Sequence, residues 1–263
     1  MERNSALPYL DLAETLQARM LADQACASDG TLGVLDAHIV TLEQALAKAE
    51  ALSEQRRQEA EAATNRVRLL EANIHRLEEP LARAEAFVDQ RRQEAEAAAE
   101  RIGAAETVCF SGGTTTTEVA RRIRGRSLTV VTNAVNIASE LVVSETNRLV
   151  VIAGVARPQT YELIGPLAEQ TLTGLNVDVL FLGCDGITAA GLSTHDEIEA
   201  RTDRTMVERA ARTIIVADSS KIGRSALAAI CPLAAIDELI TDTAAPAEEV
   251  AKLRAGGIEV IQV

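Results

Sequence analysis

The feature that most restricts the fold of this chain is a series of seven short apolar segments between Thr107 and Val263. Most of them are separated by segments long enough to form a helix. Continuous apolar strands that alternate with helices indicate a parallel sheet covered on both faces. The sequence therefore predicts an α/β domain over residues 103–263. Its predicted strands are Thr107–Phe110, Leu128–Thr132, Arg148–Gly154, Asp178–Gly183, Thr213–Asp218, Asp237–Thr241 and Ile258–Val263.

The preceding region follows a different pattern, in which apolar residues recur at steps of four and three from Leu35 to Ile102. The steps form a heptad seam that is interrupted at Ser53, Arg56 and Arg91. Such a pattern is typical of a helix that packs lengthwise on another helix. We therefore expect a helical, coiled-coil-like arm over residues 35–102.

The predicted arm contains a duplication. Residues Leu46–Val67 match Leu81–Ile102 at an offset of 35 residues, which is five heptads, so both copies present the same stripe. Helical-hairpin repeats can have a similar period, but two copies are too few to stack. We expect a duplicated helix that packs on its other copy or on another subunit, which makes a homo-oligomer the expected state. Pro80 is expected to kink or break the helix.

Residues 1–34 are poorly defined by their sequence. Turn signals occur at Asp29-Gly30 and Gly33, and Leu10–Ala25 suggests a short amphipathic helix. The first 50 residues carry eight acidic and only three basic side chains. No basic recognition helix is therefore visible.

Charge and composition exclude several classes of protein. The net charge of −13 disfavours non-specific binding to nucleic acid. No run of 18 apolar residues and no signal-peptide pattern occur, so we expect a cytoplasmic protein that does not enter the membrane. The four cysteines and three histidines are scattered, which predicts buried free thiols and neither a metal site nor a cofactor.

The segment Ser111–Ala120, SGGTTTTEVA, directly follows the first predicted strand. In open α/β sheets, ligands bind where the strands end. Two glycines allow the backbone to approach a ligand, and the free amides and hydroxyls at the start of a helix can hold an anion such as phosphate. An ordinary glycine turn followed by a helix with a Ser or Thr cap would have the same residues. Later strand ends add Thr132, Asn133, Asp185, Gly186 and Lys221 to the candidate site.

Five motifs together resemble the C-terminal effector domain of DeoR-family transcriptional repressors over about residues 80–263. They are SGGTTTTEVA, LTVVTNA, ARPQTYELIGPLA, FLGCDGITAAGLST and IIVADSSKIG. The resemblance implies a fold shared with ribose-5-phosphate isomerase and CoA transferases. It also implies that a phosphorylated sugar or related metabolite binds the loops and relieves repression. The phosphate is then expected at Gly113 and Thr114–Thr116, with Thr132, Asn133, Asp185, Gly186 and Lys221 completing the pocket.

The chain departs from this family pattern at several positions. Ser111-Gly112 stands where the family has Asp-Ser, Ala153 replaces a glycine, and Asp203-Arg204 stands where Lys-Arg is usual. The family's N-terminal winged helix-turn-helix, which binds DNA, is not recognisable here. Whether this chain binds DNA is therefore open.

The sequence is compatible with three functions: a regulator, an enzyme and a scaffold. We expect a regulator, not an enzyme, that senses a phosphorylated metabolite. The second function is a sugar-phosphate isomerase or deaminase, for which Asp185, Glu199 and Lys221 are the candidate acid–base residues; Glu199 is also included among the ligand-binding residues. The third is an oligomeric scaffold with a vestigial pocket.

Overall fold

The structure is a computed structural model that describes residues 17–20, 29–104 and 106–263. The chain divides into two compact units, Met1–Pro80 and Leu81–Val263, and each is considered by itself. The predicted helix at Leu10–Ala25 lies outside the described residues except for Gln17–Met20, which are helical. Within the described ranges, no helix combines the length and apolarity needed to cross a membrane.

Helix α2 (Asp29–Glu100) contains almost the whole heptad segment. It begins earlier than predicted and includes Gly33, so the expected turn at Asp29–Gly33 is wrong. A break at Pro80 is also wrong, because the helix is continuous through that residue. A proline removes one hydrogen bond from the helical ladder, and the many Ala, Leu, Glu and Arg residues on both sides keep the remaining ones.

The second unit is built on a seven-stranded sheet in the order β12-β11-β9-β6-β1-β2-β3. Every pair of neighbouring strands in it is parallel. Each predicted strand segment corresponds to one of these seven strands, so the predicted α/β class is confirmed. The strands are β1 (Thr107–Phe110), β2 (Thr129–Thr132), β3 (Arg148–Val151), β6 (Val177–Leu182), β9 (Ala210–Val216), β11 (Glu238–Thr241) and β12 (Glu259–Gln262).

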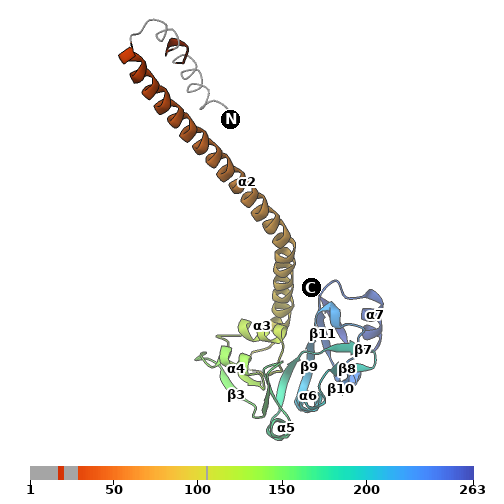
Figure 1. Cartoon of the computed structure of the whole chain (residues 1–263). Coiled ribbons are helices and arrows are strands. Elements are labelled where there is room, and N and C mark those ends of the chain that lie inside the picture. Colours follow the sequence, from red (N-terminus) through yellow and green to blue (C-terminus); the bar gives the residue numbers. More distant parts are fainter. Residues whose placement is uncertain (1–16, 21–28, 105) are drawn as a thin grey trace. The chain divides into compact units, whose positions relative to one another are not determined.

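Helices cover both faces of this sheet, as Figure 1 shows. One face packs on α3 (Thr114–Arg122), α4 (Val135–Leu141) and the last turns of α2, and the other on α5 (Pro166–Thr173), α6 (Glu197–Arg209) and α7 (Ala247–Ala255). Successive strand residues alternate between the two cores: Val108 and Phe110 of β1 face the first, and Cys109 the second. This alternation is the period of two that a pleated strand imposes.

Two small antiparallel sheets were not predicted. One is the pair β4 (Val155–Arg157) and β5 (Glu162–Ile164), and the other is β10-β8-β7. The strands of the second sheet are β7 (Gly186–Thr188), β8 (Gly191–Thr194) and β10 (Ala228–Cys231). They have only three or four residues each, too few for a clear apolar pattern. Two 3₁₀ turns, η1 (Ser219–Lys221) and η2 (Leu233–Ala235), complete the unit.

The second copy of the duplicated helix is part of the α/β core. Ala95, Ala98 and Ile102 are buried against the sheet. Their counterparts in the first copy, 35 residues earlier, are exposed in the first unit. The small alanines allow helix α2 to approach the sheet closely. The apolar stripe of the second copy therefore packs on the sheet of its own chain.

Candidate functional site

A cavity of about 870 Å³ lies at the carboxyl edge of the parallel sheet. Loops after β1, β6 and β9 line it, together with the β4–β5 connection and residues from α2, α3 and α6. This is the edge where open α/β sheets bind ligands, and the volume is in the range of small-molecule sites.

The loop after β1 begins with two glycines whose roles differ. Gly113 has φ 130°, a conformation that a residue with a Cβ atom rarely adopts. Gly112 gives room to the side chain of Glu162, whose Cγ would lie 2.5 Å from a Cβ at this position. The Gly112 amide donates to Glu162 Oε1 at 2.7 Å. One amide of the predicted anion loop is therefore already bound to a carboxyl group of the protein.

Helix α3 begins at this loop without a side-chain cap. Its first backbone hydrogen bond runs from Thr117 N to Gly113 O at 3.1 Å. The amides of Thr114, Thr115 and Thr116 precede that bond, so they have no acceptor inside the helix and lie at the positive end of its dipole. The loop therefore presents three consecutive donors at the cavity.

The threonine hydroxyls are mostly engaged within the protein. Thr116 Oγ1 and Thr117 Oγ1 donate to Gly113 O at 3.0 and 2.6 Å, and Thr115 Oγ1 donates to Glu94 Oε2 at 3.5 Å. The expectation that these hydroxyls cap the helix is wrong, because their donors point back to the loop carbonyl or across to α2. The hydroxyls hold the loop in shape, and its free donors are main-chain amides.

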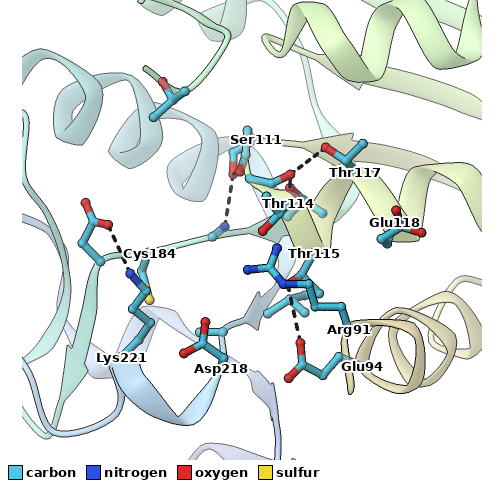
Figure 2. Close-up of a pocket in the computed structure, with 18 of the residues that line it drawn as sticks. Arg91, Glu94, Ser111, Thr114, Thr115, Thr117, Glu118, Cys184, Asp218 and Lys221 are labelled. Carbon is cyan, nitrogen blue, oxygen red and sulfur yellow. Dashed lines mark hydrogen bonds and ion pairs between the residues drawn. The ribbon is translucent and has the colours of Figure 1, made fainter. Parts of the chain in front are cut away.

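Helix α2 contributes two charged residues that the sequence analysis did not select. Figure 2 shows Arg91 and Glu94 projecting from this helix toward the loop that carries Thr114 and Thr115. The Arg91 guanidinium lies 4.1 Å from the centre of the Phe87 ring. Its buried Nε has no hydrogen-bond partner among the described residues. The interruption of the heptad seam at Arg91 was the sequence signal for this residue.

Asp185, Glu199 and Lys221 line the same cavity, as does the whole segment Ser111–Thr116. Lys221 Nζ lies 3.7 Å from Asp185 Oδ1, and Figure 2 shows Lys221 on the opposite side of the site from Arg91. Glu199 is buried, and its Oε2 lies 3.1 Å from Arg157 Nη1. The predicted residues from three different strand ends are thus brought together.

Thr132, Asn133 and Gly186 do not line the cavity. Thr132 Oγ1 donates to Phe110 O at 2.9 Å, and Asn133 Nδ2 lies 3.3 Å from Glu162 Oε1. A Cβ on Gly186 would lie 2.3 Å from Arg224 O. All three therefore have structural roles next to the site, and their contact with a ligand stays a prediction.

The cavity is more acidic than the sequence analysis expected. Burial raises the pKa of Glu94 and of Glu199 to about 7 each. Burial also raises the pKa of Glu162, and it raises the pKa of Asp203 well above its usual range. Glu162 and Asp203 were not predicted, because they lie in the β4–β5 hairpin and on α6, at no strand end of the main sheet. Carboxyl groups with raised pKa values are partly protonated near neutral pH, which reduces their repulsion of an anion.

Thiol and metal chemistry have no support in the described part of the chain. Cys109, Cys184 and Cys231 are free. Burial raises the pKa of Cys184, which lines the cavity, to about 12, so its thiolate is scarce at neutral pH. No group of three or more His, Cys, Asp or Glu side chains among the described residues is arranged to hold a metal ion. Cys26 lies outside these residues.

The chain thus has an α/β domain with a cavity of ligand size at the carboxyl edge of its sheet, and a long helix precedes this domain. Residues 87–243 match the family model described as the DeoR C terminal sensor domain. The chain belongs to this family.

Its curated relatives include three regulators. A protein described as a candidate repressor of the aga operon in Escherichia coli O157:H7 is 42% identical, with 59% of each chain covered. The transcriptional regulator GlpR of Haloferax volcanii is 37% identical, with 61% of this chain and 63% of its own covered. The glycerol-3-phosphate regulon repressor of E. coli K12 is 32% identical, with 51% of this chain and 54% of its own covered. The matches thus span less than two thirds of these relatives.

Among solved structures, ribose 5-phosphate isomerase A from Methanocaldococcus jannaschii is similar at 16% identity, with a TM-score of 0.37. The similarity covers 51% of this chain and 53% of the isomerase. At this level the similarity says nothing about activity.

Proposed function

We propose that this chain is a DeoR-like transcriptional regulator whose cavity binds a phosphorylated sugar or a similar small anion. The observation that carries the proposal is the start of α3, where three main-chain amides without helical acceptors face a cavity of ligand size. Anions bind such helix starts because donors and dipole act together. The repressor names of the relatives support the same function.

Arg91 supplies the charge that complements these amides. It projects toward the loop (Figure 2), and its buried Nε has no hydrogen-bond partner in the part of the chain that the structure describes. Lys221 also lines the cavity, and its ammonium group is paired with Asp185. A phosphate in this position receives charge-assisted hydrogen bonds, which are the strong ones. The carboxyl groups nearby are compatible with an anion because burial favours their protonated form.

A binding experiment on the Arg91→Gln variant tests this function. Calorimetry with hexose 6-phosphates and with the corresponding unphosphorylated sugars measures the phosphate contribution directly. Loss of one charge-assisted contact should weaken phosphate-bearing ligands about tenfold or more and leave the unphosphorylated sugars unchanged. Lys221→Ala should act in the same direction.

The neighbouring Arg92→Gln is the matched control, since Arg92 is exposed and does not line the cavity. Its affinities should equal those of the unmodified chain. Equal weakening of phosphorylated and unphosphorylated ligands by Arg91→Gln would count against an anion at this place.

Helix α2 provides a physical route from the cavity to the arm. The same helix carries Arg91 and Glu94 in the cavity wall and continues N-terminally as the heptad arm. A ligand transmits a signal only if it binds one arrangement of the protein better than another. Direct contact between α2 and the bound anion gives the ligand this differential interaction. The first 50 residues, with eight acidic and three basic side chains, do not favour contact with DNA.

We also propose that the arm forms a homo-oligomer through its heptad seam. Val67, Leu70, Ile74 and Leu77 are exposed in the first unit, each by half or more of its surface. A seam of this kind is buried when two helices pack. Replacing Leu70 and Leu77 with Asp should lower the mass measured by light scattering. An unchanged mass would show that the seam does not join subunits.

One observation favours an enzyme as the second candidate: Asp185, Glu199 and Lys221 line one cavity. Incubation with pentose and hexose phosphates decides between the two functions. Turnover that is lost in Glu199→Gln would favour an isomerase or deaminase, and binding without turnover favours the regulator. A thermal shift separates the regulator from a scaffold, because a ligand at 100 times its dissociation constant adds about 2.7 kcal/mol of stability. A flat response to the whole panel would favour the scaffold.

A further inference from the structure

Four acidic residues, Glu162, Asp185, Glu199 and Asp203, form a carboxyl cluster in the cavity wall. They come from β5, the loop after β6, and helix α6, and all but Asp185 are buried. Only Glu162 of this cluster contacts the loop after β1, through the Gly112 amide. The other three carboxyl groups are not explained by that contact. The cluster therefore requires an explanation of its own.

Asp203 is the least satisfied member of the cluster. Only 3% of it is exposed, and its Oδ1 has no hydrogen-bond partner among the described residues. The charged groups that act on it are Glu162, Glu199 and Asp185, all of them acidic. The next residue, Arg204, donates to Ala229 O and Ile230 O and so does not compensate it.

A buried carboxyl group without a donor is costly, and native proteins normally satisfy such groups. Asp203 lines the cavity, so a molecule bound there can supply the donor that the described residues do not.

Thr194 lies between two members of the carboxyl cluster. Its Oγ1 lies 2.6 Å from Glu199 Oε1 and 3.0 Å from Asp185 Oδ2. A hydroxyl group has one proton and donates it to one acceptor. The second contact is a hydrogen bond only if one of the two carboxyl groups is protonated. The raised pKa of Glu199 agrees with this requirement.

The cations that face the cluster are already paired. Arg157 lies 3.1 Å from Glu199 Oε2 and 3.3 Å from Asp196 Oδ2, and Lys221 lies 3.7 Å from Asp185 Oδ1. Neither is among the groups that act on Asp203. A metal ion is not the missing partner, because no cluster of potential ligands among the described residues has the required arrangement.

Resting on the function proposed above, we propose that the carboxyl cluster binds a cationic amino group of the effector. The effector is then a phosphorylated amino sugar with a free amine, its phosphate at the start of α3 and its ammonium group at Asp203. An ammonium group offers three donors and a compensating charge, whereas a sugar hydroxyl offers one donor and no charge. In this arrangement the start of α3 binds the negative phosphate, and the carboxyl cluster binds the positive ammonium group.

Calorimetry with matched sugar phosphates tests this inference on the full chain at about pH 6.5. The probes are glucosamine 6-phosphate and galactosamine 6-phosphate, compared with glucose 6-phosphate, galactose 6-phosphate and the two N-acetylated amino sugar phosphates. We expect the free amines to bind about tenfold tighter or more. Their binding should also release protons, because an ammonium group favours the ionised carboxyl groups. Titrations in buffers of different ionisation enthalpy measure that release.

The Asp203→Asn variant assigns the effect to the cluster. It should lose the preference for the free amines and bind the amino and hydroxy sugar phosphates with similar affinity. Because asparagine has nearly the same size and cannot ionise in this buried position, the melting temperature of the variant should not fall. Glu208→Gln, on the exposed side of the same helix, is the matched control and should keep the preference.

Two results would overturn the inference, and they differ from each other. If hydroxy or N-acetyl sugar phosphates bind as tightly as the free amines, the amine assignment is wrong while the anion-sensing function stands. If no phosphorylated sugar in the panel binds, both the inference and the proposed function fail.

Discussion

Glu94 provides a test of the site's electrostatics that needs no ligand. This residue of α2 is fully buried, and burial raises its pKa from the ordinary value of 4.5 to about 7. Asp242 and Asp218 add to the shift. At about 1.4 kcal/mol for each pKa unit, the shift corresponds to about 3 kcal/mol.

The sign of the effect follows from proton binding. The native state holds the Glu94 proton more tightly than the unfolded chain, so this group lowers the free energy of unfolding as the pH rises from about 4.5 to about 7. Above pH 7 the whole cost is present, and below pH 4.5 it is absent. In Glu94→Gln the group cannot ionise. The variant should therefore gain up to about 3 kcal/mol over the unmodified chain between pH 5 and pH 8.

Scanning calorimetry at pH 5 and pH 8 measures this difference. For a domain of this size, 1 kcal/mol corresponds to about 2–4 °C in melting temperature. Glu59→Gln is the matched control, because Glu59 occupies the equivalent position in the first copy of the duplication and is exposed. Titrating groups that do not interact with Glu94 contribute equally to both proteins and cancel in the comparison. An equal pH dependence of Glu94→Gln and the unmodified chain would refute the reasoning, since it would show that Glu94 ionises normally in the folded protein.

Two further predictions concern packing. Gly112→Ala should destabilise the α/β unit by about 1–3 kcal/mol in chemical denaturation, because its Cβ would lie 2.5 Å from Glu162 Cγ. The control Gly33→Ala, with no atom within 4 Å, should stabilise its helix by about 0.5–1 kcal/mol, and similar losses for the two would contradict the packing argument. Ala98→Leu should cost about 1–3 kcal/mol at the contact between α2 and the sheet, whereas Ala63→Leu, at the equivalent position in the first copy, should cost little. Equal melting temperatures of these two variants would show that the close approach at Ala98 is unimportant.

The sequence was sufficient for the main sheet because each of its strands is apolar over several consecutive residues. Residues 108–110 and 179–182 are buried at every position, so these strands are covered on both faces and their apolar runs are continuous. The hairpin β4–β5 and the sheet β10-β8-β7 were missed because three- and four-residue strands depend on tertiary contacts. The length of α2 was nearly correct. A break at Pro80 was wrong, since local propensity outweighed one lost hydrogen bond, and a kink there stays a prediction.

The site was predictable where its residues follow strands of the main sheet. Ser111–Thr116, Asp185 and Lys221 lie at such positions, and they line the cavity together. Arg91 and Glu94 were hidden in a helix that the heptad pattern assigned to packing between helices. Asp203 was noticed only as a departure from the family pattern, because its burial and its missing donor depend on the fold around it.

A crystal structure of the chain with a bound sugar phosphate, such as glucosamine 6-phosphate, tests the central claim most directly. The claim predicts the phosphate within hydrogen-bond distance of the amides of Thr114, Thr115 and Thr116, with the Arg91 guanidinium beside it. A phosphate bound elsewhere, or an empty cavity at a saturating concentration of ligand, would contradict the account.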